Sequence, residues 1–195
     1  MSEGALIEIA MACPDLRRAP RFTLPAPYRI RWWRTGDLGV WLAIQREADR
    51  LQTVAEPVFR KYYGRNEAEF PQRICFLCDQ AGREVGTASA WYGDSDPGKD
   101  WGRVHWVAIV PLHQGKGLAR PLISAVLDRM EALGHRKAYL TTESERILAI
   151  RLYLSLGFKP AARSAAERRA WLGVGEKMEG WKNGIVGDWG RRGPG

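Results

Sequence analysis

A short glycine-rich turn is the part of this sequence best suited to chemistry. Residues 114–120 read QGKGLAR and lie between a strand-like apolar run and a helix-like apolar run. Because Gly115 and Gly117 carry no side chains, backbone N–H groups in such a turn can approach an anion closely. A helix beginning near residue 117 adds unpaired N–H groups and about half a positive charge, and Lys116 and Arg120 add full charges. The turn therefore predicts a phosphate site, most naturally for a pyrophosphate.

Two common phosphate-binding loops do not fit this turn. A nucleoside-triphosphate loop needs G-x-x-x-x-G-K followed by Ser or Thr. Here Val110 holds the place of its first glycine and Gly117 the place of its hydroxyl residue. A dinucleotide loop needs G-x-G-x-x-G, and Arg120 holds the place of its last glycine. The turn therefore matches neither signature. It shares with both loops the exposed backbone N–H groups at the start of a helix.

Length and composition indicate one globular domain with a sizeable core. The chain has 195 residues, of which 45% are hydrophobic and 27% charged, as in ordinary globular proteins. The formal net charge of +8 suits an anionic partner, such as nucleic acid, a membrane surface or a phosphate-bearing cofactor. The basic residues are spread along the chain rather than clustered, which disfavours nucleic acid.

The N-terminal sequence and the cysteines favour a cytoplasmic location without a membrane partner. No stretch reaches the roughly 18 apolar residues of a membrane span, and residues 1–20 lack the basic start of a signal peptide. Cys13, Cys75 and Cys78 are an odd number, which suits a reducing compartment. Cys75 and Cys78 are three apart in a strand-like run, so they point to opposite faces. No second Cys or His pair completes a zinc site, and we expect no metal.

The patterning of apolar residues predicts an α/β protein. The expected elements are a strand at 28–34, helices at 38–51 and 54–63, strands at 73–79, 84–92 and 103–110, a helix at 117–133, a strand at 137–142, a helix at 147–156, an extended piece from 158 and a helix at 165–178. This order implies a sheet with an antiparallel front half and a helix that crosses over later.

The same patterning suggests three segments. Residues 1–27 contain four prolines and few periodic apolar positions, so we expect a loosely attached N-terminal arm. Residues 28–182 are expected to form a single domain. Residues 183–195 are expected to be a flexible tail.

Two motifs together resemble the GNAT superfamily of acyl-CoA-dependent N-acyltransferases. Gln114-Gly115-Lys116-Gly117-Leu118-Ala119 resembles its Q/R-x-x-G-x-G/A signature, and VAIVP before it resembles the strand that leads into that signature. ILAIRLYLSLGF at 147–158 resembles the second motif, a helix followed by Tyr-x-x-x-Gly-Phe. The resemblance covers roughly residues 100–160. It implies a GNAT-like mixed, mostly antiparallel central sheet flanked by about four to five helices.

The resemblance also implies which residues hold acetyl-CoA and which act on it. The implied cofactor-binding residues are Val107, Ile109, Gln114, Gly115, Lys116, Gly117, Leu118, Ala119, Arg120, Arg146 and Tyr153. The strand around 107–109 pairs with the pantetheine arm, and the Ile109 N–H polarises the thioester carbonyl. Tyr153 aligns with the tyrosine that commonly protonates the departing thiolate. A phenol of pKa about 10 donates to a thiol of about 8.5 only with geometric help.

The sequence departs from the family pattern at two functional positions. Arg146 stands where many members have a cofactor-contacting Asn, so a charge contact or an ordinary solvated arginine replaces it. Arg103 stands where members often carry a carboxylate base. His105, two residues on and facing the same side, is a candidate base or water relay because imidazole has a suitable pKa. The alternative is a buried, hydrogen-bonded histidine. Glu143, at the end of the next strand, is a second candidate base.

The resulting functional prediction is an enzyme that transfers an acetyl group from acetyl-CoA to a primary amine by direct attack. The alternative is a non-catalytic module that binds or senses acyl-CoA, which the missing carboxylate and Asn favour. The nine tryptophans either pack the core or line an aromatic acceptor pocket. The acceptor itself is not identified by the sequence, and homodimers are common in the family.

Overall fold

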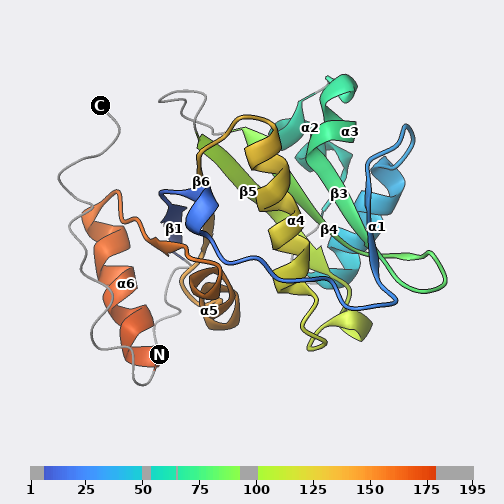
Figure 1. The fold of residues 1–195 in the computed structure, drawn as a ribbon. Coiled ribbons are helices and arrows are strands. Elements are labelled where there is room, and N and C mark those ends of the chain that lie inside the picture. Colours follow the sequence, from blue (N-terminus) through green and yellow to red (C-terminus); the bar gives the residue numbers. More distant parts are fainter. Residues whose placement is uncertain (1–6, 50–53, 65, 93–100, 179–195) are drawn as a thin grey trace. The chain divides into compact units, whose positions relative to one another are not determined.

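The computed structural model describes residues 7–49, 54–64, 66–92 and 101–178 (Figure 1). The chain divides into two compact units, and the residues predicted to bind and act on a cofactor are distributed over both. Of the described residues, the terminal unit contains 7–20, 101–102 and 134–178. The central unit contains 21–49, 54–64, 66–92 and 103–133.

The central unit carries strands in the order β2-β3-β4-β5. The β2–β3 and β3–β4 pairs are antiparallel. Its elements are β2 (Arg29–Trp32), α1 (Leu38–Ala48), α2 (Glu56–Tyr63), the 3-10 turn η2 (Glu67–Glu69), α3 (Phe70–Arg73), β3 (Ile74–Cys78), β4 (Glu84–Tyr92), β5 (Trp101–Ile109), the 3-10 turn η3 (Pro111–His113) and α4 (Ala119–Ala132). The first two residues of β5 belong to the terminal unit.

Helix α4 packs on the strands of the central unit because its apolar residues fall on one stripe. Its contacts with β4 are extensive, and Figure 1 shows it lying along the strands. The stripe is fully buried at Leu122, Ile123, Val126, Leu127 and Met130, at the spacing that predicts a helix from the sequence.

Seven buried rings form an aromatic cluster in the same unit. Its members, from six different elements or their ends, are Trp33, Trp41, Phe59, Tyr63, Phe70, Phe76 and Trp91. Phe59 contacts four other members, since its ring lies against those of Trp33, Trp41, Tyr63 and Phe70 at centroid distances of 4.6 to 5.6 Å. Such rings carry much of the apolar area that a core of this size buries.

The terminal unit carries strands in the order β6-β1-β7, with both pairs antiparallel. Its elements are β1 (Glu8–Cys13), the 3-10 turn η1 (Leu16–Arg18), β6 (Lys137–Glu143), α5 (Ile147–Ser155), β7 (Lys159–Pro160) and α6 (Ala165–Lys177). Helix α6 packs on β1. It begins at a Ser164 cap, whose hydroxyl oxygen accepts a hydrogen bond from the Glu167 N–H at 3.1 Å, as N-caps commonly do.

The N-terminal segment is not a loose arm, which corrects the expectation from the sequence. Residues 8–13 form β1, paired with β6 over its whole length from Glu8↔Glu143 to Cys13↔Ala138. Five successive residues of β1 are buried. A strand buried on both faces shows no alternation of apolar and polar residues. Residues 8–13 were therefore not predicted as a strand from their periodicity. The single domain at 28–182 stays a prediction, and residues 183–195 lie outside the described residues.

The structure confirms the mixed α/β class with mostly antiparallel strands. The described residues contain six α-helices, of which α3 has only four residues and was not predicted. The helix expected from residue 117 begins at Ala119. Within the described ranges, no helix has the length and apolarity needed to cross a membrane.

Candidate active site

Strand β5 is irregular in its middle. Trp106 adopts φ 49°, the one positive φ of a non-glycine residue in the described structure, and this conformation is uncommon for a residue with a Cβ. Its carbonyl oxygen accepts a hydrogen bond from Nε2 of the buried Gln45 on α1, at 3.0 Å. The side chain of Gln45 thereby satisfies a backbone group at the irregular residue.

Beyond the irregular residue, β5 is held against β4 on one edge. The Val110 N–H donates to the Val85 carbonyl oxygen at 2.9 Å. A side chain on Gly86 would bring its Cβ within 2.9 Å of the Ala108 carbonyl oxygen, so glycine permits this close approach. Because backbone N–H groups of successive residues in an extended strand alternate in direction, the Ile109 N–H does not share the direction of the Val110 N–H toward β4.

The turn that follows is built to expose backbone N–H groups. Gly115 and Gly117 have φ 72° and 75°, a region that glycine enters without steric cost. The N–H groups of residues 115–119 donate to no described protein group, and no side chain caps α4 at Leu118. A helix start with unpaired N–H groups binds anions. The Lys116 and Arg120 side chains are exposed beside it.

Gln114 connects this turn to β5. Its side-chain Nε2 donates to the Ile109 carbonyl oxygen at 2.7 Å, and its backbone N–H donates to the Pro111 carbonyl oxygen at 3.1 Å. The resemblance implied that Gln114 binds the cofactor. In the structure, its side-chain amide and its backbone N–H instead donate hydrogen bonds within the protein. It fixes the turn relative to Ile109, the residue expected to polarise a thioester.

His105 lies in an aromatic environment on the same unit. Its ring contacts those of Tyr62, Tyr63 and Trp106 at centroid distances of 5.3 to 5.8 Å. The side chain is 8% exposed, and its Nε2 has no hydrogen-bond partner among the described residues. Burial, and secondarily the Arg103 charge, lower the pKa of His105 from 6.5 to about 3. The expectation of a suitable pKa for a base is therefore wrong, because the imidazole stays neutral and weakly basic.

The terminal unit contains the other three predicted residues. Tyr153 lies in α5, with its ring 6.1 Å from that of Phe158. Burial raises the pKa of Tyr153 to about 12, although the Arg146 charge opposes this rise. The Arg146 Nε donates to the Glu143 carboxylate at 2.8 Å. The two residues predicted as a cofactor contact and as a second base thus form an ion pair with each other.

Sequence reasoning missed three supporting residues of the central unit. One is Gln45, which donates to the Trp106 carbonyl oxygen. The others are Gly86, which allows the close approach of Ala108, and Tyr28, whose hydroxyl is hydrogen-bonded to His113. None of the three lies in a recognisable motif. His113, to which no role was assigned, is buried and accepts or donates a hydrogen bond of 3.0 Å to the Tyr28 hydroxyl. Its position directly before Gln114 is the only sequence signal that pointed to it.

The chain belongs to the acetyltransferase (GNAT) family, whose model matches residues 41–158. The match spans β5, the glycine turn, α4 and α5. It therefore confirms the resemblance that rests on the two sequence motifs.

Named relatives and solved structures agree with this family. A mycothiol acetyltransferase of Geodermatophilus obscurus is 30% identical over 158 residues, 77% of this chain and 51% of that protein. An L-methionine sulfoximine/L-methionine sulfone acetyltransferase of Salmonella typhimurium is 38% identical over 81 residues, 40% of this chain and 47% of that protein. The chain thus spans about half the length of the curated relatives it matches.

Two solved structures support the fold. A GCN5-related N-acetyltransferase from Sphaerobacter thermophilus superposes with a TM-score of 0.66 at 20% identity, covering 80% of this chain and 48% of that one. The yncA protein of Salmonella typhimurium, solved with its cofactor acetyl-CoA, has a TM-score of 0.56 at 26% identity. That match covers 69% of this chain and 80% of the other.

Proposed function

We propose that this protein is an N-acetyltransferase that moves an acetyl group from acetyl-CoA to a primary amine by direct attack. The observation that carries the proposal is the run of unpaired N–H groups at residues 115–119, placed at an uncapped helix start in a chain of the GNAT family. The presence of acetyl-CoA in the related yncA structure supports the choice of cofactor.

In this proposal the central unit binds the cofactor. The N–H groups of residues 115–119 hold the pyrophosphate, with Lys116 and Arg120 adding charge. The backbone of Val107 and Ile109 pairs with the pantetheine arm, and the Ile109 N–H stabilises the negative charge that develops on the thioester oxygen. Arg146, which the resemblance also implies as a cofactor contact, belongs to the terminal unit.

We assign to Tyr153 the role of donating a proton to the leaving thiolate. The amine nitrogen bonds to the thioester carbon, the carbon–sulfur bond breaks, and the sulfur takes the phenol proton. The proton released by the amine replaces that proton through solvent. Burial raises the pKa of Tyr153 to about 12, so the phenol stays protonated at neutral pH but is a weaker acid than an ordinary tyrosine. The transfer therefore requires the phenol to contact the sulfur directly as negative charge develops on it.

His105 is assigned a weaker role than a general base. A neutral imidazole of pKa about 3 can accept a hydrogen bond from an amine or from a water, but it cannot hold a proton at neutral pH. An amine acceptor that loses its proton at small cost fits such a site. Deprotonating an α-amine at pH 7 costs about 1 kcal/mol, against about 4–5 kcal/mol for a lysine side chain.

A non-catalytic acyl-CoA-binding module is the second candidate function. Arg103 in place of a carboxylate and the weakly basic His105 favour it. For both candidate functions we propose a cytoplasmic location. Cys13, Cys75 and Cys78 are all free thiols, and free thiols suit a reducing compartment.

Calorimetric titration with CoA and acetyl-CoA, combined with thiol release across a panel of amines, tests the proposal. Binding together with release establishes the transferase. Tyr153→Phe should then lower kcat by about 100-fold, the scale of general acid catalysis, without changing the Kd of acetyl-CoA. Binding without release from any amine supports the binding module. Absence of binding would overturn both candidate functions.

A further inference from the structure

One face of α4 carries a line of polar residues that the cofactor-binding role does not explain. Arg120, Ser124, Asp128 and Glu131 are spaced four, four and three residues apart, so they share one side of the helix. The line starts at the glycine turn and runs to the last turn of α4. Ser124 is only 3% exposed, although its hydroxyl needs a hydrogen-bond partner when buried.

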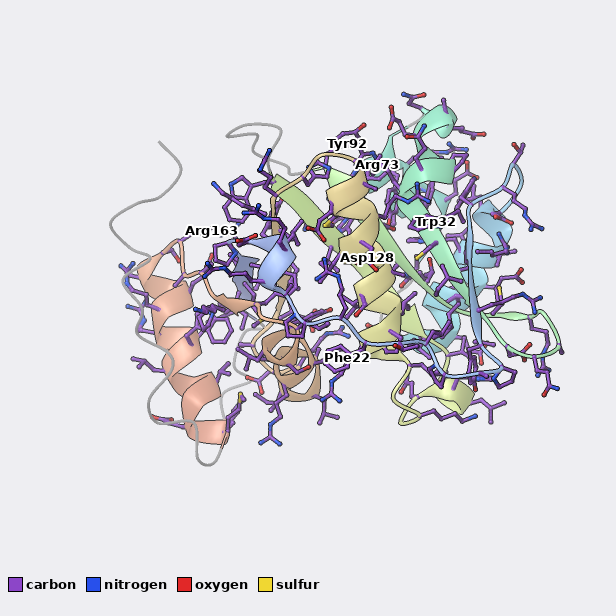
Figure 2. All side chains as sticks on the ribbon, in the orientation of Figure 1. Phe22, Trp32, Arg73, Tyr92, Asp128 and Arg163 are labelled. Carbon is purple, nitrogen blue, oxygen red and sulfur yellow. The ribbon has the colours of Figure 1, made fainter. Side chains whose placement is uncertain are left out.

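The segment at residues 21–28 lies along this line, and we refer to it as the strap. Arg21 donates from Nε to Asp128 at 2.5 Å and from Nη2 to Glu131 at 2.6 Å. The Phe22 N–H donates to the Ser124 hydroxyl oxygen at 3.0 Å. In Figure 2, Phe22 lies beside the lower end of α4, where the helix begins, and Asp128 lies higher on the same helix.

The strap reaches both sides of the glycine turn. On the helix side, the guanidinium of Arg120 sits 5.4 Å from the centroid of the Phe22 ring, within the range of a cation–π contact. On the strand side, the Tyr28 hydroxyl lies 3.0 Å from His113 Nδ1, and the two rings meet edge to face at 5.7 Å. His113 precedes Gln114, whose side chain binds Ile109.

We propose that Phe22 and Tyr28 are positioning residues, which hold the 113–120 segment in its anion-binding geometry before the cofactor arrives. The inference rests on the proposed function of that segment. Arg120 is a long and exposed side chain, and such a side chain loses rotamer freedom when it engages a phosphate. A side chain already held against a ring loses less on binding, so preorganisation raises affinity.

The expected result of removing the Phe22 ring is a loss of cofactor affinity of about two- to fivefold, the scale of an exposed cation–π contact. Phe22→Leu should raise the Kd of CoA by this factor and the KM of acetyl-CoA with it, while kcat stays unchanged. Phe22→Tyr, which restores an aromatic face, should recover the affinity. The effect should vanish with S-acetylpantetheine, which lacks the pyrophosphate.

A matched control exists on the same helix. The Arg129 guanidinium sits 4.0 Å from the ring centroid of Trp32, nine residues and about 14 Å along α4 from Arg120. Trp32→Leu removes the same kind of contact far from the turn, and Figure 2 places Trp32 away from Phe22. This variant should leave the Kd of CoA unchanged even if it lowers the melting temperature.

A double-mutant cycle between Phe22→Leu and Arg120→Leu decides whether the ring acts through the arginine. Coupling between the two sites should make Phe22→Leu nearly silent in the Arg120→Leu background, and additive losses would overturn that link. Tyr28→Phe keeps the ring but removes the hydroxyl from His113, and it should also raise the Kd of CoA. If the unaltered protein binds CoA and neither strap variant weakens binding, the strap proposal alone falls. If the unaltered protein binds no CoA, the proposed function falls as well.

Discussion

Within the central unit, the turn at 114–120 and the aromatic cluster are built from different parts of the chain. The turn is exposed at residues 114–117, and what it offers to a ligand is mainly backbone N–H. The cluster is made of buried rings that contact one another. Binding thus depends on backbone conformation in one region, and stability depends on side-chain packing in the other. Substitutions in the two regions should therefore separate affinity from folding free energy.

The largest effect is expected in the aromatic cluster. Phe59 is fully buried and contacts four rings. Phe59→Ala removes those contacts and leaves a cavity, so the free energy of unfolding should fall by about 3–5 kcal/mol. Urea denaturation monitored by tryptophan fluorescence measures this loss. The remaining folded protein should bind CoA with unchanged affinity.

Phe59→Leu serves as the comparison for this variant, because it keeps part of the volume and should lose less stability. A Phe59→Ala protein that stays as stable as the unaltered one would show that the cluster is not the centre of the core. A folded variant with weaker CoA affinity would show that packing and binding are coupled.

The second effect is expected in the turn itself. Gly117 has φ 75°, and a Cβ placed there meets no atom within 4 Å. Gly117→Val therefore causes no clash, but it strains the backbone by about 1–2 kcal/mol and pushes the N–H groups out of alignment. We expect the Kd of CoA, measured by calorimetry, to rise by about 100-fold (about 2.7 kcal/mol).

Gly134 gives a control with the same backbone strain. Its φ is 89° and a Cβ there also meets no atom within 4 Å, but it lies after the C-terminal end of α4. Gly134→Val should lower stability by a similar amount without reducing CoA affinity. Equal losses of affinity in both glycine variants would mean that strain anywhere in the fold weakens binding.

The third effect is a pH dependence caused by the burial of His105. Its pKa is about 3 in the folded protein against 6.5 ordinarily. Between these values the unfolded chain binds one more proton, so stability falls as pH falls. The loss is about 1.4 kcal/mol per pH unit, or about 2 kcal/mol from pH 6 to pH 4.5. His105→Phe should remove this slope, measured by urea denaturation at several pH values. An unchanged slope in the variant would assign the pH dependence to other groups.

The sequence predicted the parts of the fold whose patterns are local. The helical stripe of α4 and the strands around β4 follow directly from spacing. The turn follows from the two glycines, whose positive φ the structure then shows. β1 was missed because its five buried residues show no period. The four-residue α3 was missed because it is too short to show one.

The candidate site was predicted in its residues but not in its environment. Resemblance placed His105 on β5, but only the structure shows the three rings around it and the pKa that follows from burial. The strap was read as part of a loose arm, because its contacts with α4 join residues more than 100 positions apart. No local pattern encodes such contacts.

The smallest effect is expected where the turn depends on a side chain. Gln114 donates to the Ile109 carbonyl oxygen at 2.7 Å, so the backbone geometry of the turn is not independent of packing. Gln114→Met keeps the length of the side chain but removes its donor, at a cost of about 1 kcal/mol. We expect the Kd of CoA to rise about fivefold, together with a lower kcat, because Ile109 also supplies the N–H assigned to the thioester. Leu112→Ala, at a neighbouring residue that is 74% exposed, should change neither value. A Gln114→Met protein with unaltered Kd and kcat would show that the glycines alone set the geometry of the turn.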